Sequence, residues 1–155
     1  MPHFKAIIED NTCKIFNTVV LAVIQYDDKR KILASLIGGD FAFRLEPGID
    51  KNVRVLENGI EILKFKFDYW WGSATLITNG EPTGYKITGK AFKPGTRLVD
   101  ADNNDVVIVK ASKSSFMMTD FDVEAIHPDV TPFLIAITVY YHIYTSIGKM
   151  QALMI

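Results

Sequence analysis

The feature that most constrains the fold is an apolar segment near the end of the chain, TPFLIAITVYYHIYTSIG (131–148). It contains no Asp, Glu, Lys or Arg, although 23% of the whole chain is charged. Thr131 suits an N-cap and Pro132 suits the first helical position, whereas Gly148 is a typical stop signal. The segment therefore predicts one helix over 133–147.

Two explanations exist for a helix of this kind. The first explanation is a membrane anchor, because the 17 residues from Pro132 to Gly148 match the lower limit of the roughly 17–25 residues that span a bilayer. Thr138, His142 and Ser146 would be costly in lipid, however. The other explanation, which we favour, is a helix that is apolar on all sides because protein surrounds it.

Most of the remaining chain is typical of short strands. The stretch NVRVLENGIEILKFKF (52–67) contains two extended segments around Asn58-Gly59, the strongest short hairpin signal. On the second segment, alternation places two kinds of side chain on opposite faces. One face is apolar and carries Leu63, Phe65 and Phe67; the other is mixed and carries Ile62, Lys64 and Lys66.

Similar patterns continue on both sides of this hairpin. The sequence predicts a turn at 79–84, a strand over 85–92, a turn at Lys93-Pro94-Gly95, a hairpin over 97–112 and a strand over 116–126. Towards the N-terminus, residues 31–48 indicate strands. KIFNTVVLAVIQY (14–26) is compatible with a buried strand pair or a short apolar helix, since periodicity does not decide between them.

An antiparallel sheet of short hairpins can bury the apolar helix by closing around it. A closed barrel has no free edges, and a helix can fill its interior. A chain of 155 residues is the length of one ordinary domain and can bury about 68–70% of its unfolded surface. The sequence therefore predicts a single, mainly β domain over 1–155: a closed antiparallel β-barrel around a central C-terminal helix.

The charge balance limits the partners. A net charge of −1 gives no overall attraction to nucleic acid or to an anionic membrane, so no nucleic-acid partner is predicted and membrane binding needs a local basic patch. Cys13 is the only cysteine, which favours a reducing compartment. The first residues lack the pattern of a secretory signal. We expect a cytoplasmic protein without a cofactor.

The order of these elements also carries a family resemblance. GYKITGKAFKPGTRLVDADNNDVVIVKASKSSFMMTDFDVEAIHPDVTPFLIAITVYYHI (84–143) runs from a strand through an Asp- and Asn-rich turn and an aromatic strand to an apolar helix. It resembles the C-terminal half of the tubby C-terminal-like superfamily, which includes tubby proteins, phospholipid scramblases and LURP-one-related proteins. ENGIEILKFKFDYWWGSATLI is similar to the first half, so the resemblance covers about residues 50–147. It implies a twelve-stranded barrel around a hydrophobic helix and, from the tubby proteins, phosphoinositide binding.

Five lysines come from strands that a meander would make neighbours: Lys64, Lys66, Lys86, Lys90 and Lys93. The commoner explanation for such charges is a solvated outer face. The more specific hypothesis is that these lysines form a small anion-binding site. The resemblance implies that its ligand is an anionic phospholipid or phosphoinositide head group, and that the protein associates peripherally with a membrane.

Catalytic groups are not recognisable in the sequence. There is no evident nucleophile–base pair or acid pair, and His3, His127 and His142 are too scattered for a local metal site. His142 is expected to be a hydrogen-bonded core histidine, with a pH-sensitive role as the alternative. We therefore expect a non-enzymatic binding or scaffold module for phospholipids or protein partners. The alternative is an enzyme or small-ligand carrier with a pocket at the barrel mouth.

Overall fold

The computed structural model describes residues 3–27, 33–48, 52–68, 73–90, 93–112 and 120–153. These residues form twelve strands and one helix. In chain order they are β1 (His3–Glu9), β2 (Thr12–Phe16), β3 (Val20–Tyr26), β4 (Ala34–Gly38), β5 (Ala42–Pro47), β6 (Val53–Glu57), β7 (Ile60–Asp68), β8 (Ser73–Thr78), β9 (Glu81–Lys90), β10 (Lys93–Val99), β11 (Asp105–Ala111), β12 (Asp120–Ala125) and α1 (Pro132–Leu153).

The strands form a continuous antiparallel meander. Each strand pairs with the next one along the chain, and β1 pairs with β12, so that the sheet closes into a barrel. The predicted closed antiparallel barrel is therefore confirmed. The uncertain stretch 14–26 is a strand pair, β2 and β3, and not a helix.

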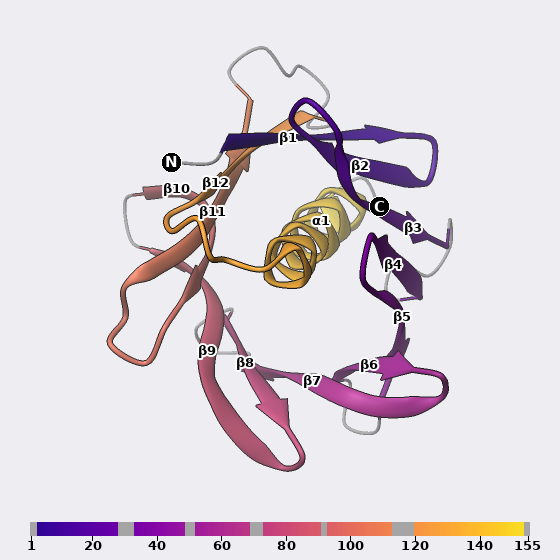
Figure 1. The fold of residues 1–155 in the computed structure, drawn as a ribbon, viewed down its shortest axis with the longest axis vertical. Helices are drawn as coiled ribbons and strands as arrows, with labels where there is room; N and C mark the ends of the chain where they lie inside the picture. The colour runs from indigo at the N-terminus through magenta and orange to yellow at the C-terminus, as the bar shows by residue number, and fades with distance from the viewer. Residues whose placement is uncertain are drawn as a thin grey trace.

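Helix α1 runs through the interior of this barrel (Figure 1). Ala136, Ile137, Thr138 and Val139 are each 0% exposed. Because successive residues of an α-helix point about 100° apart, four consecutive buried residues mean that protein encloses the helix on all sides. The prediction of a core helix is confirmed. Among the described residues, no helix combines the length and the apolar character needed to cross a membrane.

The predicted end of this helix is wrong. Gly148 was expected to stop it, but α1 continues through Gly148 to Leu153. A single glycine costs a helix only about 1 kcal/mol relative to alanine, so it interrupts the helix only where other interactions favour a turn.

Two of the hairpins use the same turn chemistry. Asn58 and Gly59 join β6 to β7 with φ angles of 52° and 82°, and Asn79 and Gly80 join β8 to β9 with φ angles of 53° and 80°. Two successive residues with positive φ define the turn whose twist matches that of the flanking strands. The predicted hairpin around Asn58-Gly59 is confirmed.

The turn predicted at Lys93-Pro94-Gly95 is wrong. Strand β10 begins at Lys93, and its pairing with β9 shifts register between Lys93 and Arg97. The positive φ of Gly95, 95°, therefore serves a bulge within a strand and not the connection between two strands. Proline is compatible with a bulge, where the ladder lacks a hydrogen bond. The predicted strand over 116–126 is observed from Asp120, because 116–119 lie outside the described residues.

Candidate functional site

Alternation along β7 separates core side chains from a basic outer row. Leu63 and Phe65 face the interior and are buried, and the Phe65 ring lies 6.1 Å from that of Tyr140 on α1. Lys64 is half-buried and Lys66 exposed on the opposite side of the same strand. The barrel core thus fixes the direction of both lysines, as the sequence predicts.

Strand register places three of the five predicted lysines on one stretch of the outer wall. Lys66 on β7 is the partner of Thr75 on β8, and Thr75 is the partner of Lys86 on β9. Since neighbouring strands lie about 4.8 Å apart, the Cα atoms of Lys66 and Lys86 lie about 10 Å apart. Lys64 is two residues from Lys66 on the same face.

The other two lysines lie where β9 meets β10. The backbones of Lys90 and Lys93 are partners in the ladder between these strands. The side chains of Lys90 and Lys93 lie outside the described part of the chain.

Two arginines extend this wall and were not anticipated from the sequence. Arg54 on β6 is the direct partner of Lys64, and Arg44 lies on the next strand, β5. The sequence of both strands contains the pattern that indicates an outward-facing arginine. Arg44 stands between Phe43 and Leu45, and Arg54 stands between Val53 and Val55, so alternation sends each arginine outward when its apolar neighbours turn inward.

We refer to the outer wall of β5–β9 that carries Arg44, Arg54, Lys64, Lys66 and Lys86 as the basic face. Glu46 is the acidic residue within it, and its Oε1 lies 3.4 Å from Nη2 of Arg54. Glu61 and Asp68 lie towards the two ends of β7. The centre of the wall therefore has an excess of positive charge, although the whole chain has a net charge of −1.

A polar hollow of about 520 Å³ lies beside Lys86, between that lysine and the turn joining β10 to β11. Thr75, Tyr85 and Asn103 contribute to its lining. Asp100 also borders it, but its Oδ1 accepts hydrogen bonds from the backbone N–H groups of Asp102 and Asn104, at 3.0 and 2.9 Å. This carboxylate therefore stabilises the turn, and Lys86 remains the cation at the rim of the hollow.

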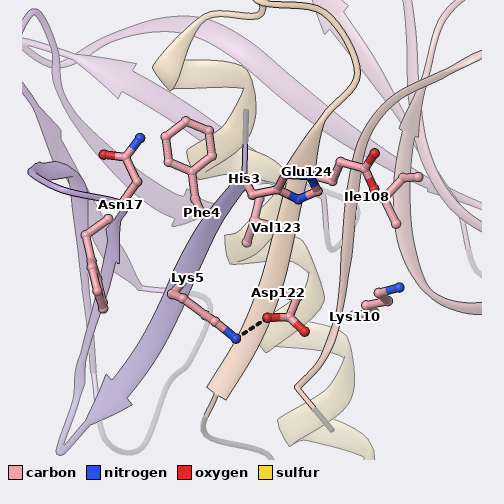
Figure 2. A pocket seen from close by; sticks show the side chains of 10 residues that line it. His3, Phe4, Lys5, Asn17, Ile108, Lys110, Asp122, Val123 and Glu124 are labelled. Atoms are coloured by element: carbon pink, nitrogen blue, oxygen red, sulfur yellow. Dashed lines mark hydrogen bonds and ion pairs between the residues drawn. The ribbon is translucent and has the colours of Figure 1, made fainter. Parts of the chain in front are cut away.

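The wall formed by β2, β1, β12 and β11 differs in charge. A hollow of about 320 Å³ on this side is shown in Figure 2. Lys5 of β1 forms an ion pair with Asp122 of β12, and Lys110 of β11 lies on the other side of this carboxylate (Figure 2). Glu124 also lines the hollow. Lysines of β1 and β11 thus flank carboxylates of β12, so this wall does not carry a single sign of charge.

The barrel mouth at which α1 begins contains an apolar hollow of about 570 Å³. Three phenylalanines border it, and their ring centroids lie 4.8–5.8 Å apart: Phe41, Phe43 and Phe133. Val20 at the start of β3 is 57% exposed beside it. This volume is within the range of about 300–1,000 Å³ that is typical of small-molecule pockets.

His142 is the buried titratable group of the core helix. Its Nδ1 lies 2.7 Å from Oγ1 of Thr96 on β10, and its ring packs edge-on against Phe121. Its Nε2 is buried without a hydrogen-bond partner in the described residues. Burial lowers the pKa of His142 to about 4, so the ring is neutral at physiological pH. The prediction of a hydrogen-bonded core histidine is confirmed.

Metal and thiol chemistry were the other possibilities to consider among the described residues. No cluster of three or more His, Cys, Asp and Glu residues that could hold a metal ion is found in the described part of the chain. Cys13 is buried, and burial raises the pKa of its thiol to about 12. The thiol is therefore protonated at neutral pH and is a poor nucleophile.

The fold is that of a closed twelve-stranded barrel with a central helix, and its most distinctive surface is the basic face. Comparison of the chain with protein-family models, with curated proteins and with solved structures gave no significant match.

Proposed function

We propose that this chain is a non-enzymatic binding module that engages anionic phospholipid head groups through its basic face. The observation that carries the proposal is the convergence of Lys64, Lys66 and Lys86, with Arg44 and Arg54, on one wall of the barrel. The resemblance to the tubby C-terminal-like superfamily supports a phosphoinositide or another anionic phospholipid as the ligand. The proposal places the protein at the cytoplasmic surface of a membrane.

The energetics suit a reversible, peripheral attachment. Each Lys or Arg near an anionic membrane surface gains about 1 kcal/mol, so three to five such groups give several kcal/mol without insertion into lipid. The outer wall of a barrel is a rigid support, because its residues alternate with core side chains such as Phe65. The basic residues can therefore contact several head groups together.

Charge reversal on β7 tests this function. We expect wild-type protein to sediment with vesicles that contain phosphatidylserine or a phosphoinositide at low salt, and Lys64→Glu/Lys66→Glu to remain in the supernatant. Lys14→Glu/Lys110→Glu is the matched control, because it changes the net charge equally on exposed lysines of β2 and β11. Circular dichroism should show that both double variants keep the fold.

Equal loss of binding in the two double variants would contradict a localised site. If wild-type protein ignores anionic vesicles even at low salt, the basic face is ordinary solubilising charge. A protein-binding scaffold then becomes the leading function.

The apolar hollow at the barrel mouth favours a second candidate function, the carriage of a small apolar ligand. Phe41 and Phe133 supply an apolar lining at an opening of the barrel. Native mass spectrometry of freshly purified protein tests this function, since a carrier should retain a bound molecule. Phe133→Asp should release it, whereas Lys66→Glu should not.

A further inference from the structure

We propose that the wall between β5 and β6 contains an oxyanion pocket in which Arg44 and Arg54 bind a phosphate monoester. Its identification as a head-group subsite rests on the function proposed above. Soluble phosphate monoesters present the same chemistry, so the pocket itself does not depend on a membrane.

The pocket is a hollow of about 440 Å³ on the outer surface of the barrel. Leu56 lines it and is only 8% exposed, although its partner in the ladder is the outward-facing Arg44. The hollow therefore has an apolar side chain at its base and charged side chains around it. Asn58 and Gly59, in the turn between β6 and β7, complete one end.

The cations around this hollow repel one another when no anion is present. Arg44 is the partner of Leu56, and Arg54 is the partner of Glu46, so the two arginines are diagonal neighbours about 7–8 Å apart at their Cα atoms. Lys64 stands directly opposite Arg54 on the other side. Like charges in such positions destabilise a sheet, and a bound anion would reverse this effect.

Hydrogen-bond donors in the hollow also lack acceptors. Glu46 approaches Nη2 of Arg54 at 3.4 Å, which is a long contact for a charged pair. Nε of Arg54 is buried and has no partner in the described residues. No ion pair of Arg44 occurs within that same part of the chain. Among the residues that line the hollow, Glu46 is the carboxylate and Arg44 and Arg54 are the cations. Glu61 lies opposite Leu56 on the next strand, outside this lining. The lining therefore carries a net positive charge.

The chemistry of these donors selects the class of anion. A guanidinium presents paired N–H groups that match two oxygens of a phosphate or carboxylate. A phosphate monoester carries a charge of about −1.5 to −2 at neutral pH and three strong acceptor oxygens. It therefore satisfies two arginines better than a phosphodiester, which carries one negative charge. Phosphatidylinositol 4-phosphate presents such a monoester, whereas phosphatidylserine does not.

Titration of the full chain with inorganic phosphate, followed by NMR, tests the pocket directly. The backbone amide signals of Asn58 and Gly59 should shift with saturation. Arg44→Gln should weaken binding by at least tenfold, and Arg54→Lys, which keeps the charge but loses the fork, should weaken it as well. Lys14→Gln on β2 is the control and should bind phosphate like wild type. Without phosphate, Arg44→Gln should melt no lower than wild type, since it relieves repulsion at an exposed position.

The pocket is overturned if phosphate does not bind at millimolar concentration, or if both arginine variants bind it like wild type. Vesicle-binding measurements distinguish a failure of the pocket from a failure of the proposed membrane function. Phosphate binding through Arg44 without vesicle binding supports the pocket and contradicts the membrane role. Vesicle binding that Arg44→Gln leaves unchanged, together with no binding of phosphate, supports the membrane role and contradicts the pocket. A preference for phosphatidylinositol 4-phosphate over phosphatidylserine, lost in Arg44→Gln, identifies the lipid as the source of the monoester.

Discussion

At the residue scale, burial of His142 in the barrel disfavours the protonated form of its ring. Its pKa is about 4 in the folded protein and about 6.5 in the unfolded chain, because the barrel interior disfavours the charged ring. Above pH 6.5 both states hold the neutral ring. As the pH falls from 6.5 to 4, only the unfolded chain gains the proton, so the folded state loses stability over this window.

We therefore expect the free energy of unfolding to fall by about 3 kcal/mol between pH 6.5 and 4 through this group, at about 1.4 kcal/mol per pH unit. Urea titrations at several pH values measure the loss. His142→Asn retains a polar atom near Thr96 and does not titrate, so it should show a shallower decline. Parallel curves for the two proteins would mean that His142 does not determine the acid sensitivity.

Ala136 tests the enclosure of the helix at a single position. It is 0% exposed, and Asp at this site would place an unpaired carboxylate in the barrel interior. An unpaired buried charge costs several kcal/mol, so Ala136→Asp should be unfolded at room temperature by circular dichroism. Ala101→Asp, in the exposed turn after β10, is the control and should melt like wild type. A normal melting temperature for Ala136→Asp would contradict a core position.

Among the strands, β10 shows how a glycine permits a close approach between neighbours. A Cβ atom added at Gly95 would overlap the carbonyl oxygen of Val109 on β11, and its φ of 95° is unfavourable for other residues. Gly59 also has a positive φ, 82°, but an added Cβ meets nothing within 4 Å. Comparison of alanine variants at the two positions separates the energetic cost of the overlap from the cost of the backbone conformation.

We expect Gly59→Ala to lower the free energy of unfolding by about 1 kcal/mol, from its backbone conformation alone. Gly95→Ala should cost about 1–3 kcal/mol more, because β10 and β11 must move apart. Chemical denaturation of both variants measures the difference. Equal costs would show that the bulge adapts without strain.

The hairpin at Asn58-Gly59 and the core helix were accessible from the sequence because local chemistry determines them. The turn predicted over 79–84 is shorter in the structure, since β9 begins at Glu81. Asn-Gly accepts the positive φ angles of a two-residue turn, and the alternation of Leu63 and Phe65 with Lys64 sets which face is buried. The role of Lys93-Pro94-Gly95 was not accessible in this way. The same residues suit a turn or a bulge, and only the register between β9 and β10 decides.

In the candidate site, too, local patterns could be predicted from the sequence, whereas contacts between strands could not. The outward direction of Lys64 and Lys66 is a property of one strand and could be predicted. The convergence of Arg44 and Arg54 with Lys64 depends on the register of three strands. Alternation within one strand determines which face a side chain occupies, but not which residue lies opposite it on the next strand. The hollow over Leu56 arises from that register as well.

At the scale of the whole molecule, helix α1 fills the interior of the barrel and packs against the inward-facing side chains of the sheet. Deletion of 131–155 would leave the inward-facing residues of the barrel, such as Phe65 and Phe121, without their contacts to the helix. We expect the truncated protein to be insoluble on expression, and the full chain to be soluble without detergent. A folded, soluble truncation would contradict a helix-filled barrel.

The distribution of charge over the barrel is the central claim of the functional account. The basic face gathers cations of β5–β9, whereas Lys5, Asp122 and Lys110 alternate in sign on another wall. The binding of wild-type protein to phosphatidylserine or phosphoinositide vesicles, measured over a range of salt concentrations, tests this claim most directly. Since the Debye length falls from about 30 Å at 0.01 M to about 8 Å at 0.15 M, we predict measurable binding at low salt that decreases steeply with added salt. Absence of binding at the lowest salt concentration, or binding that salt leaves unchanged, would contradict the account.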